Sequence, residues 1–216
     1  MRYDTVIFDL DGTLLDTLQD LAAAVNYALH QQGYPPRTVQ EVCRFVGNGV
    51  EKLMRRAVPA GLPEERIMAA LAVFKEYYAL HNNDATAPYP GIEALLDHLK
   101  ARGVRMAIVS NKNDPNVKAL ARLYFPTTIS MAVGEGGGVR AKPCPDTVLH
   151  VMNTWGCDPS RVLYVGDSDV DIQTARNAGV DCASVCWGFR PEQELRAAGA
   201  TLLVHTAQEL EAVVLG

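Results

Sequence analysis

The sequence predicts an α/β fold, in which a mainly parallel sheet forms the core and an α-helical subdomain is inserted into it. Short apolar runs typical of strands buried on both faces recur along the chain. Helical periodicity separates several of these runs, whereas residues 16–84 show helical periodicity only. Strand alternating with helix is the pattern of a parallel sheet with right-handed crossovers. A chain of 216 residues is long enough for such a domain and a smaller insertion.

The first expected strand ends at Asp9, because Val6, Ile7 and Phe8 form a continuous apolar run and an Asp11–Gly12 turn ends it. Runs of the same kind predict five further strands, at residues 104–110, 128–133, 161–166, 181–187 and 201–205. Apolar stripes at helical spacing predict helices near residues 92–99, 148–152 and 172–178.

Residues 10–103 separate the first expected strand from the second, although a crossover needs only about a dozen residues. Three helical stripes fill most of this segment, near residues 18–29, 42–54 and 67–78, with Gly- and Pro-rich turns between them. We therefore expect a core domain of residues 1–15 and 85–216, and a helical cap of residues 16–84 over the end of the first strand.

The composition is that of an ordinary globular protein, with 48% apolar and 21% charged residues. A net charge of -5 without a basic stripe argues against a nucleic-acid partner. The five cysteines are scattered, without a CxxC pair, which indicates reduced thiols. No apolar run has the length of a signal peptide or a membrane span. The expected protein is cytoplasmic, a monomer or homodimer, and acts on a small molecule rather than on nucleic acid or a membrane.

Polar residues follow four of the expected strands, at the edge where an open parallel sheet binds ligands. They are Asp9 and Asp11 after the first strand, Ser110 and Asn111 at the end of the second, Lys142 after the third, and Asp167 and Asp171 after the fourth.

Four carboxylates in one cleft would repel one another unless a cation compensated for their charge. Oxygen ligands without a nearby His or Cys select Mg²⁺, so the predicted cofactor is Mg²⁺ and its ligands are Asp9, Asp11, Asp167 and Asp171. Such a site suits a phosphate substrate, which Mg²⁺ would hold against Asp9. Ser110 would donate to a phosphoryl oxygen, Lys142 would balance developing charge, and Asp11 would carry the proton.

The pattern Asp9-x-Asp11-Gly12-Thr13, then Ser110-Asn111, Lys142-Pro143 and Gly166-Asp167-Ser168-x-x-Asp171, resembles the four motifs of the haloacid dehalogenase superfamily in order and spacing. This resemblance covers almost the whole chain. It implies a Rossmann-like hydrolase core with a small helical cap. It also implies an aspartyl-phosphate mechanism, in which Asp9 is the nucleophile and a metal ligand, Asp11 is the acid/base and a ligand through its carbonyl, and Asp171 is outer-sphere support.

The stretch Val46-Gly47-Asn48-Gly49, with Leu53 and Arg56, is similar to bacterial phosphoglycolate phosphatases. It implies that Asn111 and the cap residues Gly47, Asn48, Gly49 and Arg56 bind the substrate, and that phosphoglycolate is the leading substrate. The alternatives are a promiscuous sugar-phosphate or nucleotide phosphatase, a pyrophosphatase or a phosphomutase of the same superfamily, and, from another class, a non-enzymatic regulatory module.

Single residues argue against some relatives. Dehalogenases and phosphonate hydrolases lack an acid at the position of Asp11, and beta-phosphoglucomutases usually carry Glu-Asp where this chain has Gly166–Asp167. A regulatory module whose phosphoaspartate persists has little use for Asp11.

Several residues of these motifs also have a plain structural explanation. Ser168 is a suitable helix cap, Lys142 an ordinary loop lysine, and Arg56 a solvated helix charge. The order of the four motifs, rather than any one residue, favours catalysis.

Overall fold

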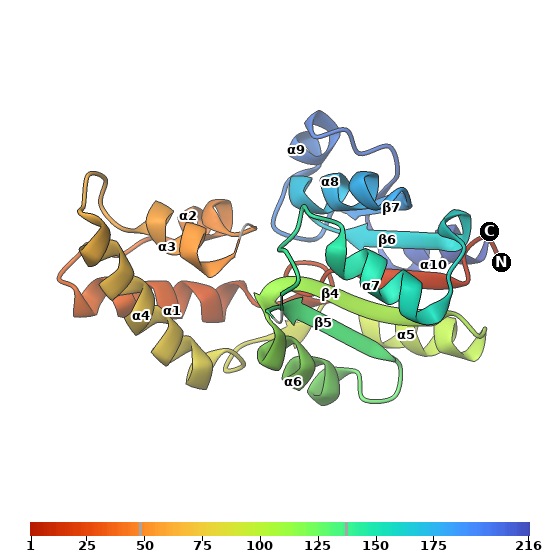
Figure 1. Cartoon of the computed structure of the whole chain (residues 1–216), viewed down its shortest axis with the longest axis horizontal. Coiled ribbons are helices and arrows are strands. Elements are labelled where there is room, and N and C mark those ends of the chain that lie inside the picture. The colour runs from red at the N-terminus through yellow and green to blue at the C-terminus, as the bar shows by residue number, and fades with distance from the viewer. Residues whose placement is uncertain (48, 137) are drawn as a thin grey trace. The chain divides into compact units, whose positions relative to one another are not determined.

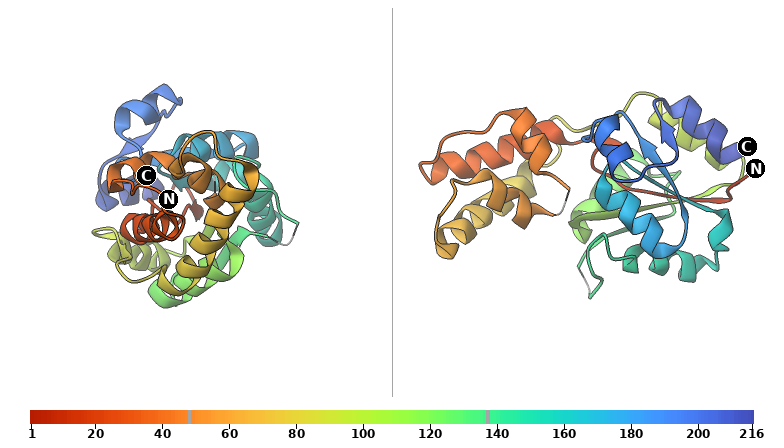
Figure 2. Two further views of the ribbon diagram at one scale, coloured as in Figure 1. Left: turned by 90° about the vertical axis from the view of Figure 1, so that its left-hand side faces the viewer. Right: turned by 90° about the horizontal axis from the view of Figure 1, so that it is seen from above.

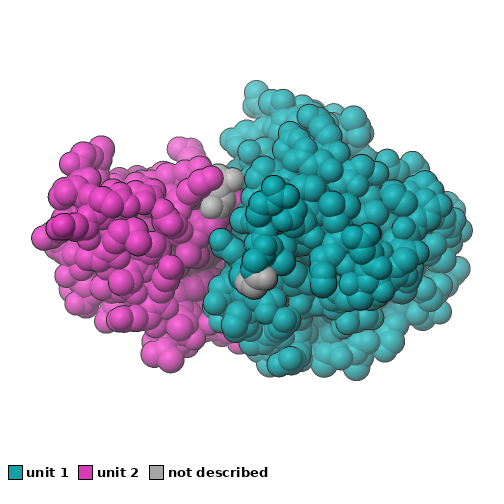
Figure 3. All heavy atoms as spheres, in the orientation of Figure 1, with its two compact units in different colours: residues 1–15, 88–216 teal, residues 16–87 magenta. Residues whose placement is uncertain are grey.

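The computed structural model describes residues 1–47, 49–136 and 138–216. The chain divides into two compact units, coloured separately in Figure 3. Unit 1 comprises Met1–Leu15 and Pro88–Gly216, and unit 2 comprises Asp16–Ala87. The chain thus re-enters unit 1 after Ala87, a few residues later than the expected domain boundary at residue 84.

Unit 1 is built on a six-stranded sheet in which every pair of neighbouring strands is parallel. Strands β4, β5, β6 and β7 of this sheet are labelled in Figure 1. The strand order is β5-β4-β1-β6-β7-β8, so that β1 lies centrally between β4 and β6. The bounds are β1 Thr5–Phe8, β4 Arg105–Asn113, β5 Met131–Glu135, β6 Val162–Gly166, β7 Asp181–Val185 and β8 Leu203–Val204. The predicted α/β class is confirmed, and each of the six expected strands is present.

Helices cover both faces of this sheet (Figures 1 and 2). Side chains of β1 alternate between the two resulting cores, since Val6 and Phe8 belong to one apolar cluster and Ile7 to the other. The first cluster includes residues of α5, α6 and α10, and the second includes residues of α7 and α8. The helices are α5 Ile92–Ala101, α6 Asp114–Tyr124, α7 Asp146–Trp155, α8 Asp169–Ala178, α9 Glu192–Ala197 and α10 Ala207–Leu215, with a 3-10 turn at Pro159–Arg161.

Helices α6, α9 and α10 are not among the predicted elements. Helix α6 buries only Val117, Leu120 and Ala121, a stripe too short to stand out by periodicity alone. Its start nevertheless carries a recognisable signal, because the Asn113 side chain accepts a hydrogen bond from the Asn116 amide and a proline lies in the first turn.

Unit 2 is a helical bundle with its own apolar core. Its helices are α1 Leu18–Gln31, α2 Val39–Phe45, α3 Val50–Ala57 and α4 Glu64–His81. The two chain connections form a short two-stranded sheet of β2 Leu15–Asp16 and β3 Ala87–Pro88. The buried carboxylate of Asp20 accepts hydrogen bonds from the amides of Ala85 and Thr86 and from the Thr86 hydroxyl, so the end of the unit is fastened to α1.

The single stripe expected near residues 42–54 is two helices in the structure. Helix α2 ends at Phe45 and α3 begins at Val50. Between them, Gly47 and Gly49 have φ values of 125° and 83°, a backbone region that favours glycine and cannot continue a helix. Among residues 1–47, 49–136 and 138–216, none of the helices combines the length and apolar character that a membrane span requires.

Candidate active site

The carboxylates of Asp9, Asp167 and Asp171 meet at the carboxyl ends of the central strands. Asp9 directly follows β1, Asp167 directly follows β6, and Asp171 lies in the first turn of α8. A hydrogen bond of 2.8 Å from the Asp9 amide to the Val165 carbonyl continues the pairing of β1 with β6, so these strands end side by side. One oxygen from each carboxylate lies within 4.8 Å of the others, and all three residues are buried.

Lys142 places its ammonium group among these acids. Its Nζ lies 2.8 Å from Oδ1 of Asp9 and 2.8 Å from Oδ1 of Asp171, and it donates to the Tyr164 hydroxyl at 3.1 Å. Burial disfavours the charged lysine, but the neighbouring carboxylates of Asp171 and Asp9 hold its pKa above the ordinary value. Lys142 is therefore a fixed positive charge at the centre of the site and is not a surface lysine.

Asp171 is held by donors on every side of its carboxylate. Oδ1 accepts from Lys142 and from the Tyr164 hydroxyl at 2.9 Å, while Oδ2 accepts from the amide and hydroxyl of Ser168 at 3.1 and 2.5 Å. Although burial alone would raise its pKa, Lys142, Ser168 and Tyr164 hold the pKa of Asp171 below its usual range. Asp171 is the anion that fixes Lys142.

Asp167 is more poorly compensated. Its Oδ2 accepts a 2.6 Å hydrogen bond from the Phe189 amide, and its Oδ1 accepts a longer one of 3.5 Å from the Thr13 hydroxyl. Burial, and then the negative charges of Asp171 and Asp9, raise the pKa of Asp167 well above its usual value. A further positive charge nearby would stabilise the ionised form of this carboxylate.

Asp9 experiences the same conflict. Burial raises its pKa to about 7, with Lys142 acting to lower the pKa and Asp171 acting to raise it. Its Oδ1 accepts hydrogen bonds from the Leu10 amide at 2.7 Å and from Lys142, which together fix the orientation of the carboxylate. Because Lys142 offers one positive charge to three buried carboxylates, the described residues leave an excess of negative charge that a divalent cation would balance.

Three glycines allow the backbone to approach these acids. A Cβ atom on Gly12 or Gly188 would meet the carboxylate of Asp167, and one on Gly166 would meet Cβ and Cγ of Asp171. Gly12 also has a φ of 87°. The close packing of Asp167 and Asp171 thus depends on glycine at these three positions, where any side chain would collide with an acid.

The sequence-predicted residues Ser110 and Asn111 lie near the end of β4. The buried Ser110 hydroxyl accepts a hydrogen bond from the Lys112 amide at 3.2 Å. Asn111 was expected to bind substrate, but its amide group is engaged with the backbone of Lys142. It donates to the Lys142 carbonyl at 3.0 Å and accepts from the Lys142 amide at 2.7 Å.

Replacing Asn111 with Ala is expected to lower the free energy of unfolding by about 1–3 kcal/mol, because both partly buried backbone groups of Lys142 lose their partner. Urea denaturation monitored by circular dichroism measures this change. Asn153→Ala, on the exposed side of α7, is the matched control and should change stability by less than about 0.5 kcal/mol. Equal losses of stability in the two variants would show that the Asn111 side chain does not hold the backbone of Lys142.

Lys112 and Tyr164 are site residues that sequence reasoning missed, and so is the contact of the Phe189 backbone amide with Asp167. Lys112 Nζ forms a 2.9 Å ion pair with Oδ1 of Asp11, and the lysine side chain is almost fully buried. The place of Lys112 in the segment Ser110-Asn111-Lys112, at a strand end, was the available signal. The contacts of Tyr164 and of the Phe189 amide with the acids carry no sequence signature.

The expected substrate-binding residues Gly47, Gly49 and Arg56 belong to unit 2 and not to the unit that carries the acids. Arg56 donates to the Phe45 carbonyl at 2.7 Å, which joins α3 to the end of α2. Asn48 lies outside the described residues.

A parallel α/β sheet with an acidic centre and a buried lysine beyond the ends of its middle strands is the architecture of an α/β enzyme whose acids could hold a metal ion. Comparison with known families agrees, since the model of the haloacid dehalogenase-like hydrolases matches residues 6–185. The chain belongs to this family of hydrolases, as its motifs had suggested.

Individual relatives carry narrower names. The chain is 37% identical over 218 aligned residues to phosphoglycolate phosphatase 1 of Pseudomonas aeruginosa, covering 95% of this chain and 77% of the relative. A solved structure from Lactobacillus delbrueckii subsp. bulgaricus, provisionally named a phosphoglycolate phosphatase, has 39% identity and a TM-score of 0.97 over 100% of both chains. CbbY from Rhodobacter sphaeroides, solved in complex with phosphate, has 26% identity and a TM-score of 0.74 over 96% of each chain.

Proposed function

We propose that this hydrolase is a Mg²⁺-dependent phosphatase that cleaves small phosphate monoesters through an aspartyl phosphate on Asp9. The observation that carries the proposal is the group of three buried carboxylates around the single charge of Lys142. A phosphoryl-transfer site needs a nucleophile, compensation for negative charge and a proton carrier close together. Asp9, Lys142 and Asp11 offer these three groups.

The residues present fit Mg²⁺. The donor atoms of Asp9, Asp167 and Asp171 are carboxylate oxygens, which Mg²⁺ prefers, and the raised pKa values of Asp9 and Asp167 mark a place where positive charge is lacking. Asp9 and Asp167 are the proposed carboxylate ligands, with the Asp11 carbonyl as a further ligand and Asp171 as support. When bound, Mg²⁺ would supply the positive charge that keeps these acids ionised and draws a phosphoryl group towards them.

In the first half of the reaction, an oxygen of Asp9 attacks the phosphorus atom and the bond from phosphorus to the ester oxygen breaks. Asp11 gives its proton to the leaving oxygen, so that an alcohol departs. The Ser110 hydroxyl donates to a phosphoryl oxygen, while the ammonium group of Lys142 stabilises the charge that develops in the transition state.

In the second half, water attacks the phosphorus atom of the aspartyl phosphate and Asp11 takes its proton. The bond from phosphorus to Asp9 breaks, which releases phosphate and restores the carboxylate. Lys112 donates to Oδ1 of Asp11 and thereby orients this carboxyl group, whose other oxygen is left to carry the proton, and the two donors to Oδ1 of Asp9 hold the nucleophile.

Phosphoglycolate is the substrate that the names of the relatives favour. The proposal assigns the choice among monoesters to unit 2 as a cap, with Gly47, Asn48, Gly49 and Arg56 as binding residues. The complex of CbbY with phosphate supports the phosphoryl part of the assignment independently of the rest of the substrate.

All five cysteines are free thiols in the structure, which suits a reducing compartment. We therefore extend the proposal to a cytoplasmic protein acting on a dissolved metabolite.

The substrate assignment predicts Mg²⁺-dependent phosphate release from phosphoglycolate with a higher kcat/KM than from sugar phosphates, nucleotides or pyrophosphate. Removing the metal with EDTA should lower the rate by at least about 100-fold, because the metal contributes several kcal/mol of transition-state stabilisation. A phosphate-release assay over this panel, with Mg²⁺ restored after chelation as the control, measures both effects.

Two results would contradict different parts of the proposal. Comparable kcat/KM values over the whole panel would contradict phosphoglycolate as the preferred substrate but not the phosphatase activity. A full rate in EDTA would remove the metal from the mechanism.

A further inference from the structure

A second group of potential metal ligands lies in unit 1 and involves none of the residues assigned to phosphoryl transfer. It consists of Cys186, Glu192 and His205. Cys186 directly follows β7 and His205 directly follows β8, while Glu192 is the first residue of α9. Parallel pairing of Val185 with Val204, and a 2.9 Å hydrogen bond from the Cys186 amide to the Val204 carbonyl, place the ends of the two strands side by side.

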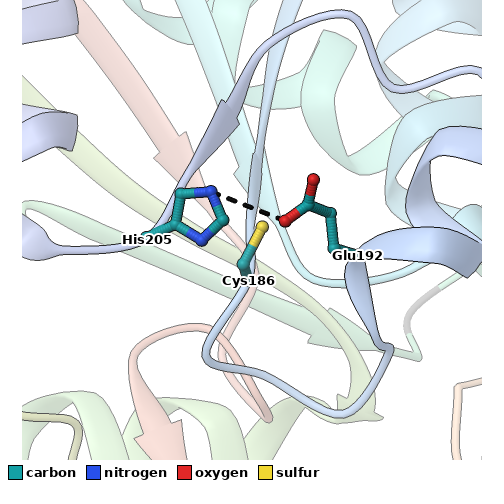
Figure 4. A group of neighbouring side chains, drawn as sticks. All are labelled: Cys186, Glu192 and His205. Carbon is teal, nitrogen blue, oxygen red and sulfur yellow. Dashed lines mark ion pairs between the residues drawn. The ribbon is translucent and has the colours of Figure 1, made fainter.

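The three side chains point towards one another, as Figure 4 shows. The Sγ atom of Cys186, a ring nitrogen of His205 and a carboxylate oxygen of Glu192 lie within 4.8 Å of one another. Nε2 of His205 is 3.6 Å from Oε2 of Glu192. Cys186 and Glu192 are half-buried and His205 is exposed, so an ion from solvent can reach the group.

These distances suit a small tetrahedral ion. With Zn–S, Zn–N and Zn–O bonds of ordinary length, two ligand atoms of a tetrahedral site lie about 3.3–3.7 Å apart. His205 and Glu192 already have this separation, at 3.6 Å, and the thiol of Cys186 lies within 4.8 Å of a ring nitrogen and a carboxylate oxygen of these residues. One thiolate, one imidazole and one carboxylate form a donor set that selects zinc over magnesium or calcium, with the fourth position left to water.

We propose that Cys186, Glu192 and His205 form a zinc-binding site. This site is separate from the acidic centre that we assign to Mg²⁺, and its existence does not depend on the proposed reaction.

A neighbouring residue already holds one of the ligands in a suitable orientation. Arg196 binds Oε1 of Glu192 at 2.7 Å, which leaves Oε2 directed towards His205. Such outer contacts to a ligating side chain fix metal ligands and raise metal affinity in known sites. The backbone of His205 is held separately, because its amide donates to Oε2 of Glu209 at 2.8 Å.

The position of the site gives it a structural consequence. Cys186 and Glu192 enclose the segment 187–191, which makes two of the contacts that shape the acidic centre. Trp187 Nε1 donates to the Thr13 carbonyl at 3.0 Å, and the Phe189 amide donates to Asp167. A zinc ion bound at both ends of this segment would fasten it against the turn that follows β1.

Cobalt provides a direct test, because Co²⁺ takes the place of Zn²⁺ and reports a thiolate ligand by a charge-transfer band. Metal-free protein is titrated with Co²⁺ in an excess of Mg²⁺, which fills the acidic centre. We expect the charge-transfer band together with tetrahedral d–d bands, saturating at one Co²⁺ per chain, and loss of both when Zn²⁺ is added. Zn²⁺ at a hundred times its dissociation constant should also lower the unfolding equilibrium constant about 100-fold.

Variants identify the ligands. Cys186→Ser should abolish the charge-transfer band, and His205→Gln, at an exposed position that leaves folding intact, should weaken Zn²⁺ binding at least about tenfold. The matched controls Cys157→Ser and His98→Gln, which alter a thiol and a His–Glu pair elsewhere in unit 1, should bind as the wild type does.

Asp167→Asn should keep the charge-transfer band, since this residue belongs to the other site. A wild-type protein without the band at saturating Co²⁺, or a band that persists in Cys186→Ser, would overturn the proposal.

Discussion

Asp9→Asn is expected to lower kcat for phosphate release by at least about 10⁴-fold, since removing a covalent nucleophile leaves only the binding and electrostatic contributions of the site. The variant keeps the size of the side chain and removes one of three crowded carboxylates. Its fold should therefore persist, as the burial that raises the pKa of Asp9 already opposes the charge at this position. Phosphate release and circular dichroism, measured on the same preparation, separate catalysis from folding.

Asp97→Asn is the matched control, because Asp97 is exposed on α5 and lies outside the acidic centre. It should retain the wild-type kcat within about twofold, as surface substitutions have small effects. If Asp9→Asn kept more than about a tenth of the wild-type rate, Asp9 would not be the nucleophile and the aspartyl-phosphate mechanism would fail.

Lys142→Met is expected to lower the free energy of unfolding by about 3–5 kcal/mol in the absence of divalent metal, because it leaves buried carboxylates without their cation. Asp9 and Asp171 each lose a 2.8 Å ion pair, while the methionine side chain fills most of the space of the lysine stem. Urea denaturation in EDTA measures the loss.

Mg²⁺ should restore part of this stability, and should stabilise Lys142→Met more than it stabilises the wild type, since the variant has the larger excess of negative charge. Lys118→Met is the control, because Lys118 pairs with Asp114 at 2.7 Å on the exposed surface of α6, where an ion pair contributes about 0–1 kcal/mol. Equal losses in the two lysine variants would contradict the central role assigned to Lys142.

The strands were predictable because each is a continuous apolar run that must be covered on both faces, and this requirement is local. The same holds for the polar residues at their ends. Once Asp9 and Asp167 are known to follow strands of one parallel sheet, they must lie at the same edge of that sheet. Their meeting within 4.8 Å confirms that geometric expectation and leaves the catalytic roles to the experiments above.

Other features could not be predicted because they depend on packing. Helix α6 has too few buried positions to show a period, and the stripe that crosses residues 42–54 hides a break made by positive φ angles. Nothing local indicates that the Asn111 side chain binds the backbone of Lys142, a residue 31 positions away. The same is true of the contact between the Phe189 amide and Asp167.

The sequence by itself determined the class of fold, the family and the identity of the acids, because strand periodicity and short motifs are local properties of the chain. Only the tertiary structure decided how charge is distributed among those acids. Asp171 receives the lysine and the hydroxyl donors, whereas Asp9 and Asp167 are left with raised pKa values. It also brought Cys186, Glu192 and His205 together. The physical reason is that burial and ion pairing depend on which segments pack side by side. The order of the strands in the sheet decides which segments these are, and it does so independently of their distance along the chain.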